Sequence, residues 1–289
     1  MAHVAFGVPQ GSILGPVIFN LFVADLHNNA NCQCFQYADD TTLYIHTKVT
    51  DLSGATTDIN YNLNRLGEYS NESNLALNVT KTKWMLVSTP QISRYHSLDR
   101  KEIDIKCNGK ALERVNVTKL LGVHLDSHLD WKEHVTKLLS FCYGVLAVLR
   151  KIRHLAPFKV RKQLAECLVL SKLDRCNTIF HALPEYQIKR LQPVQNTCVA
   201  FVLRHYAKSS DVINLNWLPI RERIELSLLK MRHKSLYYEG WPKHLQLEFQ
   251  RSCSYNLRSS DAPRLSVPRE TDTFKLMAPV KRKMFGDKR

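Results

Sequence analysis

Two adjacent aspartates, Asp39 and Asp40, are the residues of this 289-residue chain whose types and spacing most directly suggest chemistry. They stand within the run from Phe35 to Tyr44 (FQYADDTTLY), where aromatic and β-branched residues flank the acidic centre. This pattern predicts a β-hairpin with the acidic pair at its tip. Carboxylate oxygens are the ligands that Mg²⁺ prefers, and paired Mg²⁺ ions activate the attacking hydroxyl group in phosphoryl transfer. An ordinary turn is the alternative, because aspartate is also a favoured turn residue.

The elements around this hairpin follow from turn residues and apolar spacing. Residues 7–16 (GVPQGSILGP) form a turn-rich loop that leads into a helix over the apolar stretch Val17 to Leu26. Apolar residues at helical intervals predict a second helix over Asp58 to Leu77. A strand is expected over Lys83 to Ser88, and two or three short strands over Ile103 to Leu125.

From Asp130 onward the pattern becomes helical. An apolar stripe predicts a long helix, with Val135, Leu138, Leu139, Cys142, Val145, Leu146, Leu149 and Ile152 on one face. Further helical patterns cover Phe158–Leu173, Tyr186–Leu203 and Pro219–Tyr238, and the polar, basic stretch from Arg251 is expected to be loosely packed. The chain therefore reads as an α+β part followed by a helical part.

The net charge of +15 is unevenly distributed. Residues 1–125 carry 11 basic and 11 acidic side chains, so the whole excess lies beyond them. A field of one sign favours a polyanionic partner such as nucleic acid, because each cation placed on a phosphate releases a counterion. A basic surface without a specific partner remains the alternative.

Composition excludes several other classes of protein. A hydrophobic content of 44% is too high for wholesale disorder. No apolar run approaches the roughly 20 residues that cross a bilayer, and no signal peptide is evident, so a membrane protein is not expected. The eight scattered cysteines favour reduced, mostly buried thiols of an intracellular protein over a disulfide framework or a zinc site.

The order of these motifs resembles the reverse transcriptase family, and specifically the enzymes of LINE-type, non-LTR, jockey-like retrotransposons. The resemblance rests on the loop 7–16 followed by a helix and then Tyr37-Ala38-Asp39-Asp40. Further stretches are similar to segments of these enzymes: NVTKTK (78–83), LGVHLD (121–126, the "primer grip" hairpin), LQPVQN (191–196), WLPI (217–220) and LRSS (257–260). The resemblance implies a partial polymerase palm (an antiparallel sheet with helices) over 1–126, an all-helical thumb over 127–205 and a basic C-terminal extension over 206–289.

The resemblance also implies roles for the residues of the hairpin. Asp39 is expected to be the principal ligand of Mg²⁺, with Asp40 beside it. Tyr37 and Ala38 are expected to line the primer terminus, although Tyr37 as a strand aromatic that packs in the core is an alternative. The implied partners are an RNA template, a DNA primer or target DNA, and deoxynucleoside triphosphates.

Three residues outside the hairpin receive roles in the same way. Gln10 and Gly11 are expected to contact the incoming nucleotide and the template, since a loop bounded by glycine lets the backbone approach a substrate closely. Lys81 is expected to approach the phosphates and to protonate the leaving pyrophosphate. A plain turn at Gln10-Gly11 and a solvated surface lysine at Lys81 are the alternatives.

The family also carries an earlier strand whose aspartate supplies a third metal ligand. Only Met1 to Phe6 precede Gly7 here, so we expect the C-terminal portion of a longer polymerase, inactive or nearly so by itself. Two other hypotheses are a non-catalytic nucleic-acid-binding protein derived from a retroelement, and a relic without selected activity.

Overall fold

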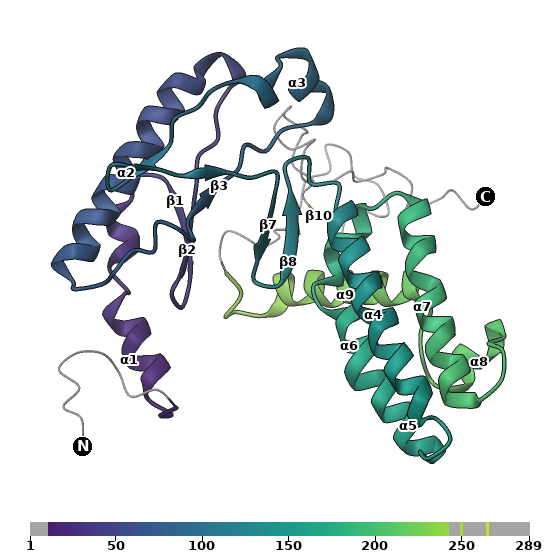
Figure 1. The fold of residues 1–289 in the computed structure, drawn as a ribbon. Helices are drawn as coiled ribbons and strands as arrows, with labels where there is room; N and C mark the ends of the chain where they lie inside the picture. The colour runs from purple at the N-terminus through teal and green to yellow at the C-terminus, as the bar shows by residue number, and fades with distance from the viewer. Residues whose placement is uncertain (1–10, 243–248, 251–263, 266–289) are drawn as a thin grey trace, which may run out of the picture. The chain divides into compact units, whose positions relative to one another are not determined.

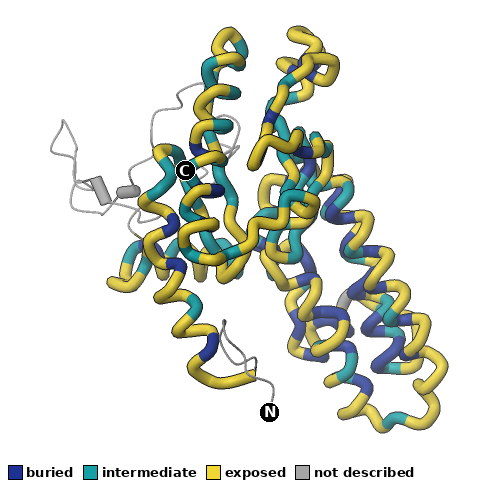
Figure 2. Tube along the Cα trace, turned by 60° about the vertical axis from the view of Figure 1, so that its left-hand side comes forward, coloured by how far each residue is buried: buried dark blue, intermediate teal, exposed yellow. Residues whose placement is uncertain are grey.

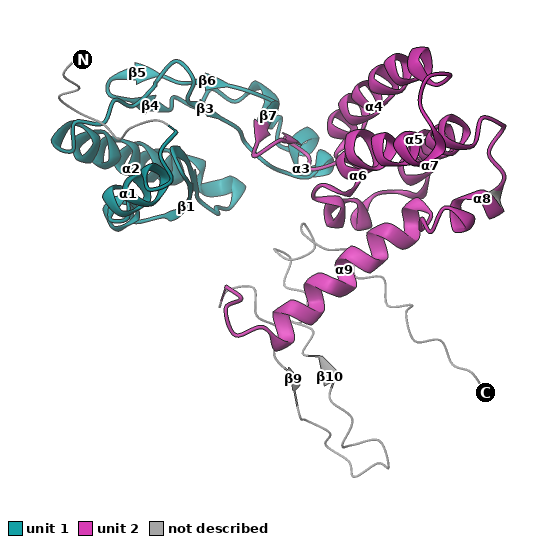
Figure 3. Ribbon diagram, turned by 90° about the horizontal axis from the view of Figure 1, so that it is seen from below, with its two compact units in different colours: residues 1–118 teal, residues 119–289 magenta. Residues whose placement is uncertain are grey.

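The computed structural model describes residues 11–242, 249–250 and 264–265, and it divides the chain into two compact units, residues 1–118 and 119–289 (Figure 3). Both units combine helices with short strands (Figure 1), which confirms the predicted α+β class. Among the described helices, none has the length and apolar character needed to cross a lipid bilayer.

Unit 1 contains three helices and a set of short strands. The helices are α1 (Gly15–Phe22), α2 (Leu52–Glu72) and α3 (Pro90–Tyr95), and the strands are β1 (Gln33–Tyr37), β2 (Asp40–Tyr44), β3 (Lys83–Trp84), β4 (Lys106–Cys107), β5 (Lys110–Ala111) and β6 (Glu113–Arg114). Antiparallel pairs join β1 with β2 and β4 with β5, whereas β3 and β6 pair in parallel. The described strands thus form two-stranded pieces in place of the expected antiparallel sheet, since most are only two residues long.

Several boundaries in unit 1 differ from the predicted ones. The predicted helix over Asp58–Leu77 begins earlier, at Leu52, and ends at Glu72. It ends because Asn74 adopts a positive φ of 54°, which lets the Leu75 N–H donate to the Ser70 carbonyl oxygen at 2.7 Å. Helix α3 was not predicted, although Thr89 caps it by accepting the Ile92 N–H at 3.3 Å.

The buried core of unit 1 is small. Ile105, Cys107 and Leu112 form its centre, with Ile59 and Trp84 among the partly buried residues against it. Polar contacts supplement this core: the indole N–H of Trp84 donates to the Leu112 carbonyl at 3.2 Å. Along α1, by contrast, the apolar residues Val17, Ile18, Leu21 and Phe22 are exposed.

Unit 2 is mainly helical. Its elements are a strand pair β7 (Val117–Leu120) and β8 (Val123–Asp126), then α4 (Lys132–Ile152), α5 (Phe158–Ala165), a π-helical turn (Glu166–Leu170), α6 (Ser171–Asp174), α7 (Glu185–Leu203), α8 (Ser209–Asn214) and α9 (Ile220–Tyr237), and a strand pair β9 (Phe249–Gln250) and β10 (Arg264–Leu265). Strand β7 spans the boundary between the units. The structure confirms the prediction of four helical segments: the long helix α4, the continuous segment from Phe158, and the helices α7 and α9. Helix α8 was not predicted.

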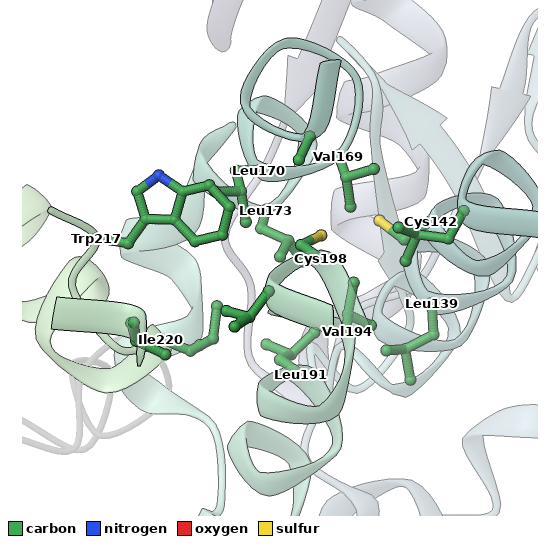
Figure 4. Close-up of a cluster of buried hydrophobic side chains, with 14 of the residues drawn as sticks. Leu139, Cys142, Val169, Leu170, Leu173, Leu191, Val194, Cys198, Trp217 and Ile220 are labelled. Atoms are coloured by element: carbon green, nitrogen blue, oxygen red, sulfur yellow. The ribbon is translucent and has the colours of Figure 1, made fainter. Parts of the chain in front are cut away.

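The core of unit 2 is large and continuous, as the buried stretches of its helices show (Figure 2). The predicted stripe of α4 is buried at Val135, Leu139, Cys142, Leu146 and Leu149, whereas Ile152 is exposed. This stripe packs against α7, whose Leu191, Val194 and Cys198 lie in the same cluster (Figure 4). Trp217 is also part of this cluster (Figure 4), and its indole N–H donates to the Glu166 carboxylate at 2.7 Å.

The seven described cysteines are free thiols, as expected. Burial raises the pKa of Cys142 to about 11 and that of Cys198 to about 12, so both stay protonated at neutral pH. The prediction that the thiols are mostly buried is only partly correct, because Cys167 and Cys176 are exposed. Cys253 lies outside the described residues.

We expect Leu146→Ala to lower the free energy of unfolding by about 2–5 kcal/mol, because the substitution leaves a cavity in the core of unit 2. Leu146 is 1% exposed, whereas Leu229 on α9 is 60% exposed and supplies a control with the same change, Leu229→Ala. Urea unfolding followed by circular dichroism measures both variants. Equal losses of stability in the two variants would contradict the packing described.

Candidate active site

The predicted hairpin is present, and its turn lies one residue earlier than the acidic pair. Tyr37 pairs with Asp40 across the strands, so the two turn residues are Ala38 and Asp39, and Asp40 is the first residue of β2. Ala38 has a positive φ of 52°, as the mirror-image turns of tight hairpins require. Glycine is the usual residue in this conformation, and an alanine there carries backbone strain of about 1–3 kcal/mol.

Both carboxylates of the hairpin are open to solvent. Asp39 and Asp40 are exposed, and neither side chain forms a hydrogen bond or an ion pair with any residue that the structure describes. Ala38 is exposed, and so is Tyr37, at 66%, which excludes the alternative that Tyr37 packs in the core. The structure therefore brings four of the predicted site residues together on one exposed turn.

The strands below the turn hold it in place. Gln33 to Tyr37 pair residue by residue with Tyr44 to Asp40, and the rings of Phe35 and Tyr44 stack with their centroids 6.5 Å apart. The side-chain amide of Gln36 donates to the carbonyl oxygen of Ala38 at 3.4 Å, next to the aspartates. These contacts fix the backbone on which the carboxylates stand.

Of the predicted loop residues, Gly11 is described and Gln10 lies outside the described residues. Gly11 is exposed and has a φ of +83°, a conformation that glycine adopts without strain. A Cβ at this position would meet no atom within 4 Å, so the backbone is accessible. Ser12 follows, and its hydroxyl oxygen accepts the Gly15 N–H at 2.9 Å, which supports the predicted helix start.

Lys81 lies on a turn that Asn78 organises. The Asn78 side-chain oxygen accepts the Lys81 N–H at 3.1 Å and the Thr80 hydroxyl at 2.7 Å. The Thr82 hydroxyl donates to the Asn78 carbonyl oxygen at 2.9 Å. Lys81 itself is exposed, and no contact between it and the acidic pair is present among the described residues.

Polar residues that position the site were missed by apolar periodicity. Buried Asn62 on α2 accepts the Asn31 N–H at 2.5 Å just before β1, and it donates to the Asp58 carbonyl oxygen at 2.7 Å. Asn60 connects α2 to β4 by accepting the Lys106 N–H at 2.8 Å. A polar residue within an otherwise amphipathic helix is the only signal for such contacts in the sequence.

The carboxylate oxygens of Asp39 and Asp40 are ligands of the type that a hard divalent cation binds, although only these two carboxylates are present at the hairpin. Carboxylate oxygens are appropriate Mg²⁺ ligands, and both are free of protein cations. Within the described ranges, however, no group of three or more histidine, cysteine or acidic side chains comes together in a way that could hold a metal ion. The hairpin thus supplies two carboxylates of a suitable type, and the described residues supply no third ligand beside them.

The N-terminal part of the chain is similar to a known protein family. Residues 3–125 match the family model "Reverse transcriptase (RNA-dependent DNA polymerase)". This stretch includes the hairpin, Gly11 and the Lys81 turn. No solved structure shows a significant match to the chain.

Individual proteins that are similar to the chain come from mobile elements. The chain is 29% identical over 140 residues to the RNA-directed DNA polymerase from mobile element jockey of Drosophila funebris, which covers 46% of this chain and 14% of that protein. It is 28% identical over 153 residues to the probable RNA-directed DNA polymerase from transposon BS of Drosophila melanogaster, which covers 50% of this chain and 16% of that protein. The resemblance to LINE-type reverse transcriptases is therefore confirmed, over a span that is about a seventh of the length of these relatives.

We expect Asn78→Ala to loosen the Lys81 turn, because its side-chain oxygen accepts two hydrogen bonds there. The loss of such bonds is worth roughly 0.5–1.5 kcal/mol. Amide hydrogen exchange measured by NMR should become faster at Lys81, whereas Asn78→Asp keeps the acceptor and should retain protection. Unchanged exchange in Asn78→Ala would show that other contacts hold the turn.

Proposed function

We propose that this chain is part of an RNA-directed DNA polymerase, which adds deoxynucleotides to a DNA primer or target DNA on an RNA template. The observation that carries the proposal is the pair of exposed, unpaired carboxylates of Asp39 and Asp40 on a strained turn, within the stretch that matches reverse transcriptases. On this proposal residues 1–126 are part of the palm, 127–205 the thumb, and 206–289 a basic extension.

Asp39 and Asp40 would hold Mg²⁺. A bound Mg²⁺ activates the attacking hydroxyl group and neutralises charge on the leaving phosphates. The protein's own contribution is to present two acceptor-only groups side by side without a competing lysine or arginine among the described residues. Tyr37 and Ala38, exposed on the same turn, would line the primer terminus.

The remaining residues would act on the nucleotide. Gly11 and Gln10 would contact the incoming nucleotide and the template, and the open backbone at Gly11 supports this role. Lys81 is an exposed ammonium group on an ordered turn, which suits an interaction with phosphates and proton donation to the leaving pyrophosphate.

We expect this chain alone to polymerise weakly or not at all. Two carboxylates leave Mg²⁺ under-coordinated, and the loss of a catalytic carboxylate typically lowers rates by orders of magnitude. Primer extension with an RNA template, a DNA primer and Mg²⁺ measures this. Robust Mg²⁺-dependent synthesis would overturn the expected inactivity, and synthesis that persists in Asp39→Asn would overturn the assignment of the site.

Metal binding can be tested without activity. We expect low concentrations of Mn²⁺, a paramagnetic substitute for Mg²⁺, to broaden the backbone NMR signals of residues 38–41 selectively. The double variant Asp39→Asn, Asp40→Asn should lose this effect, since amides bind divalent ions poorly. Asp25→Asn, at another exposed aspartate of unit 1, is the control and should leave it unchanged. Broadening that survives in the double variant contradicts a site at the hairpin.

A second candidate function is non-catalytic nucleic-acid binding. The charge distribution favours it, because the entire excess of +15 lies beyond residue 125, outside the acidic hairpin. Under this hypothesis Asp39→Ala leaves salt-sensitive binding intact and no polymerase activity exists to be lost.

A further inference from the structure

Helix α4 carries a second apolar stripe besides the one that faces the core of unit 2. It consists of Phe141, Val145, Val148 and Ile152, and we call it the outer stripe. Its members lie alternately four and three residues apart, which is the spacing at the seam between two paired helices. Phe141 is 49% exposed, Val148 is 61% exposed, Ile152 is exposed and Val145 is partly buried. One side of a long helix is therefore apolar and open to solvent.

Contacts with neighbouring helices show where the outer stripe lies on α4. The Lys172 ammonium of α6 lies over the Phe141 ring at 5.6 Å. Leu168 precedes Lys172 by four residues in the same helical segment, so it lies on the same side, and it is exposed. The opposite side of α4 contacts α7, where the Arg190 guanidinium donates to the Thr136 hydroxyl at 3.2 Å. The described elements of unit 2 thus leave the outer stripe uncovered, and Leu168 enlarges the apolar surface beside it.

The surroundings of the outer stripe are strongly basic. The stretch from His134 to Ala165 contains no aspartate or glutamate, and it contains seven lysines and arginines: Lys137, Arg150, Lys151, Arg153, Lys159, Arg161 and Lys162. Lys137 and Lys151 lie one helical turn from members of the stripe. Lys137 pairs with Glu133 at 3.2 Å, whereas Lys151 is exposed and forms no ion pair with the described residues. The apolar centre is therefore bordered by cations.

Gly144 opens the helix backbone beside the outer stripe. It lies one turn from both Phe141 and Val148, and an added Cβ would meet no atom within 4 Å. Alanine is the more stable residue in a helix interior, and there is room for it here. Glycine instead permits a close approach of another backbone or side chain to α4.

We propose that the outer stripe is a docking site for an amphipathic helix of a partner protein, with an apolar face and acidic borders. An apolar centre with a charged rim is the usual composition of a helix-binding surface. The charge of the rim decides the kind of partner, because opposite charges across an interface favour the encounter and like charges oppose it. The proposal does not depend on the proposed polymerase function.

Charge argues against two other polypeptides as the occupant. A second copy of this chain would bring one basic rim against another, and the net charge of +15 on each copy adds to the repulsion. Residues 243–289 of the chain itself carry 11 basic and 5 acidic side chains, so their charge has the wrong sign as well.

The chemistry of the stripe argues against a nucleic acid. Phosphates bind to cations, which lie only at the borders here. A nucleic acid placed on the borders would leave the exposed apolar side chains of Phe141, Val148 and Ile152 without apolar partners.

Fluorescence anisotropy of the full chain with two labelled peptides tests the proposal. The acidic peptide is an amphipathic helix of about three heptads, with leucine at positions a and d and glutamate at e and g. The neutral peptide carries glutamine in place of each glutamate. We expect the acidic peptide to bind with a Kd below about 100 μM and the neutral peptide to bind several-fold more weakly. Absence of binding by the acidic peptide would overturn the proposal.

The apolar contribution is tested at the two most exposed members of the outer stripe. We expect the double variant Phe141→Ser, Val148→Ser to bind the acidic peptide about tenfold more weakly or worse, because less apolar area is buried. Leu229→Ser on α9, at a residue that is 60% exposed, is the control and should bind normally. Circular dichroism measures whether both variants keep their helix content. Normal binding by the folded double variant would contradict docking at the outer stripe.

The charge contribution is tested by a single reversal that leaves the stripe intact. We expect Lys151→Glu to weaken binding of the acidic peptide several-fold and to leave binding of the neutral peptide unchanged. Lys189→Glu, at an exposed residue of α7, makes the same change in net charge and should have a much smaller effect. Equal effects of the two reversals would show that only net charge matters and would overturn the docking site.

Two further measurements distinguish the other occupants. A dimer that sedimentation equilibrium detects and that Phe141→Ser, Val148→Ser abolishes would assign the outer stripe to a second copy of the chain and overturn the proposal. So would a labelled oligothymidylate that displaces the acidic peptide and loses affinity in the same double variant, since the stripe would then bind nucleic acid. None of these measurements involves Asp39 or Asp40, so a failure here leaves the proposed function untouched.

Discussion

Repulsion between two neighbouring carboxylates is the physical constraint on which the functional interpretation of this chain depends. Asp39 and Asp40 are adjacent residues at a tight hairpin turn. Among the described residues, no lysine or arginine forms an ion pair with either carboxylate. In water such repulsion is modest, because exposed charges are well screened. On the proposed function, a bound substrate would exclude solvent and make this repulsion large, and a cation between the carboxylates and the phosphates would offset it. The exposure of the pair is therefore appropriate to a site that is completed by its ligands.

Much of the fold could be predicted from the sequence where one physical rule dominates. The helix α4 follows from an apolar stripe with a period of 3.6 residues, and the structure buries most of that stripe. The hairpin β1–β2 follows from flanking aromatic and β-branched residues. The turn within it was placed one residue late, because alanine at a positive φ is uncommon and Asp-Asp is the stronger turn signal.

Features that depend on single polar contacts could not be predicted in this way. Asn62 and Asn60 accept backbone N–H groups that are distant in the sequence, those of Asn31 and Lys106, whereas Asn78 accepts the Lys81 N–H within its own turn. Neither apolar periodicity nor turn composition specifies the partner of such a side chain. The same holds for the contact in unit 2 between the His124 N–H on β8 and Nδ1 of His134 on α4, two histidines that carry no metal-ligand spacing in the sequence. Their relation appears only when β8 and α4 are folded.

The two units derive their stability from different sources, and this difference bears on function. Unit 2 buries a continuous apolar cluster, which makes its backbone a rigid support for surface cations. Unit 1 has a small cluster and relies on polar contacts and short strand pairs, while the apolar residues of α1 remain exposed. Local opening costs less where few apolar contacts are broken, so we expect unit 1 to open locally more easily than unit 2. The proposed metal ligands therefore lie in the unit with the smaller apolar core, and most of the excess positive charge lies in the unit with the larger one.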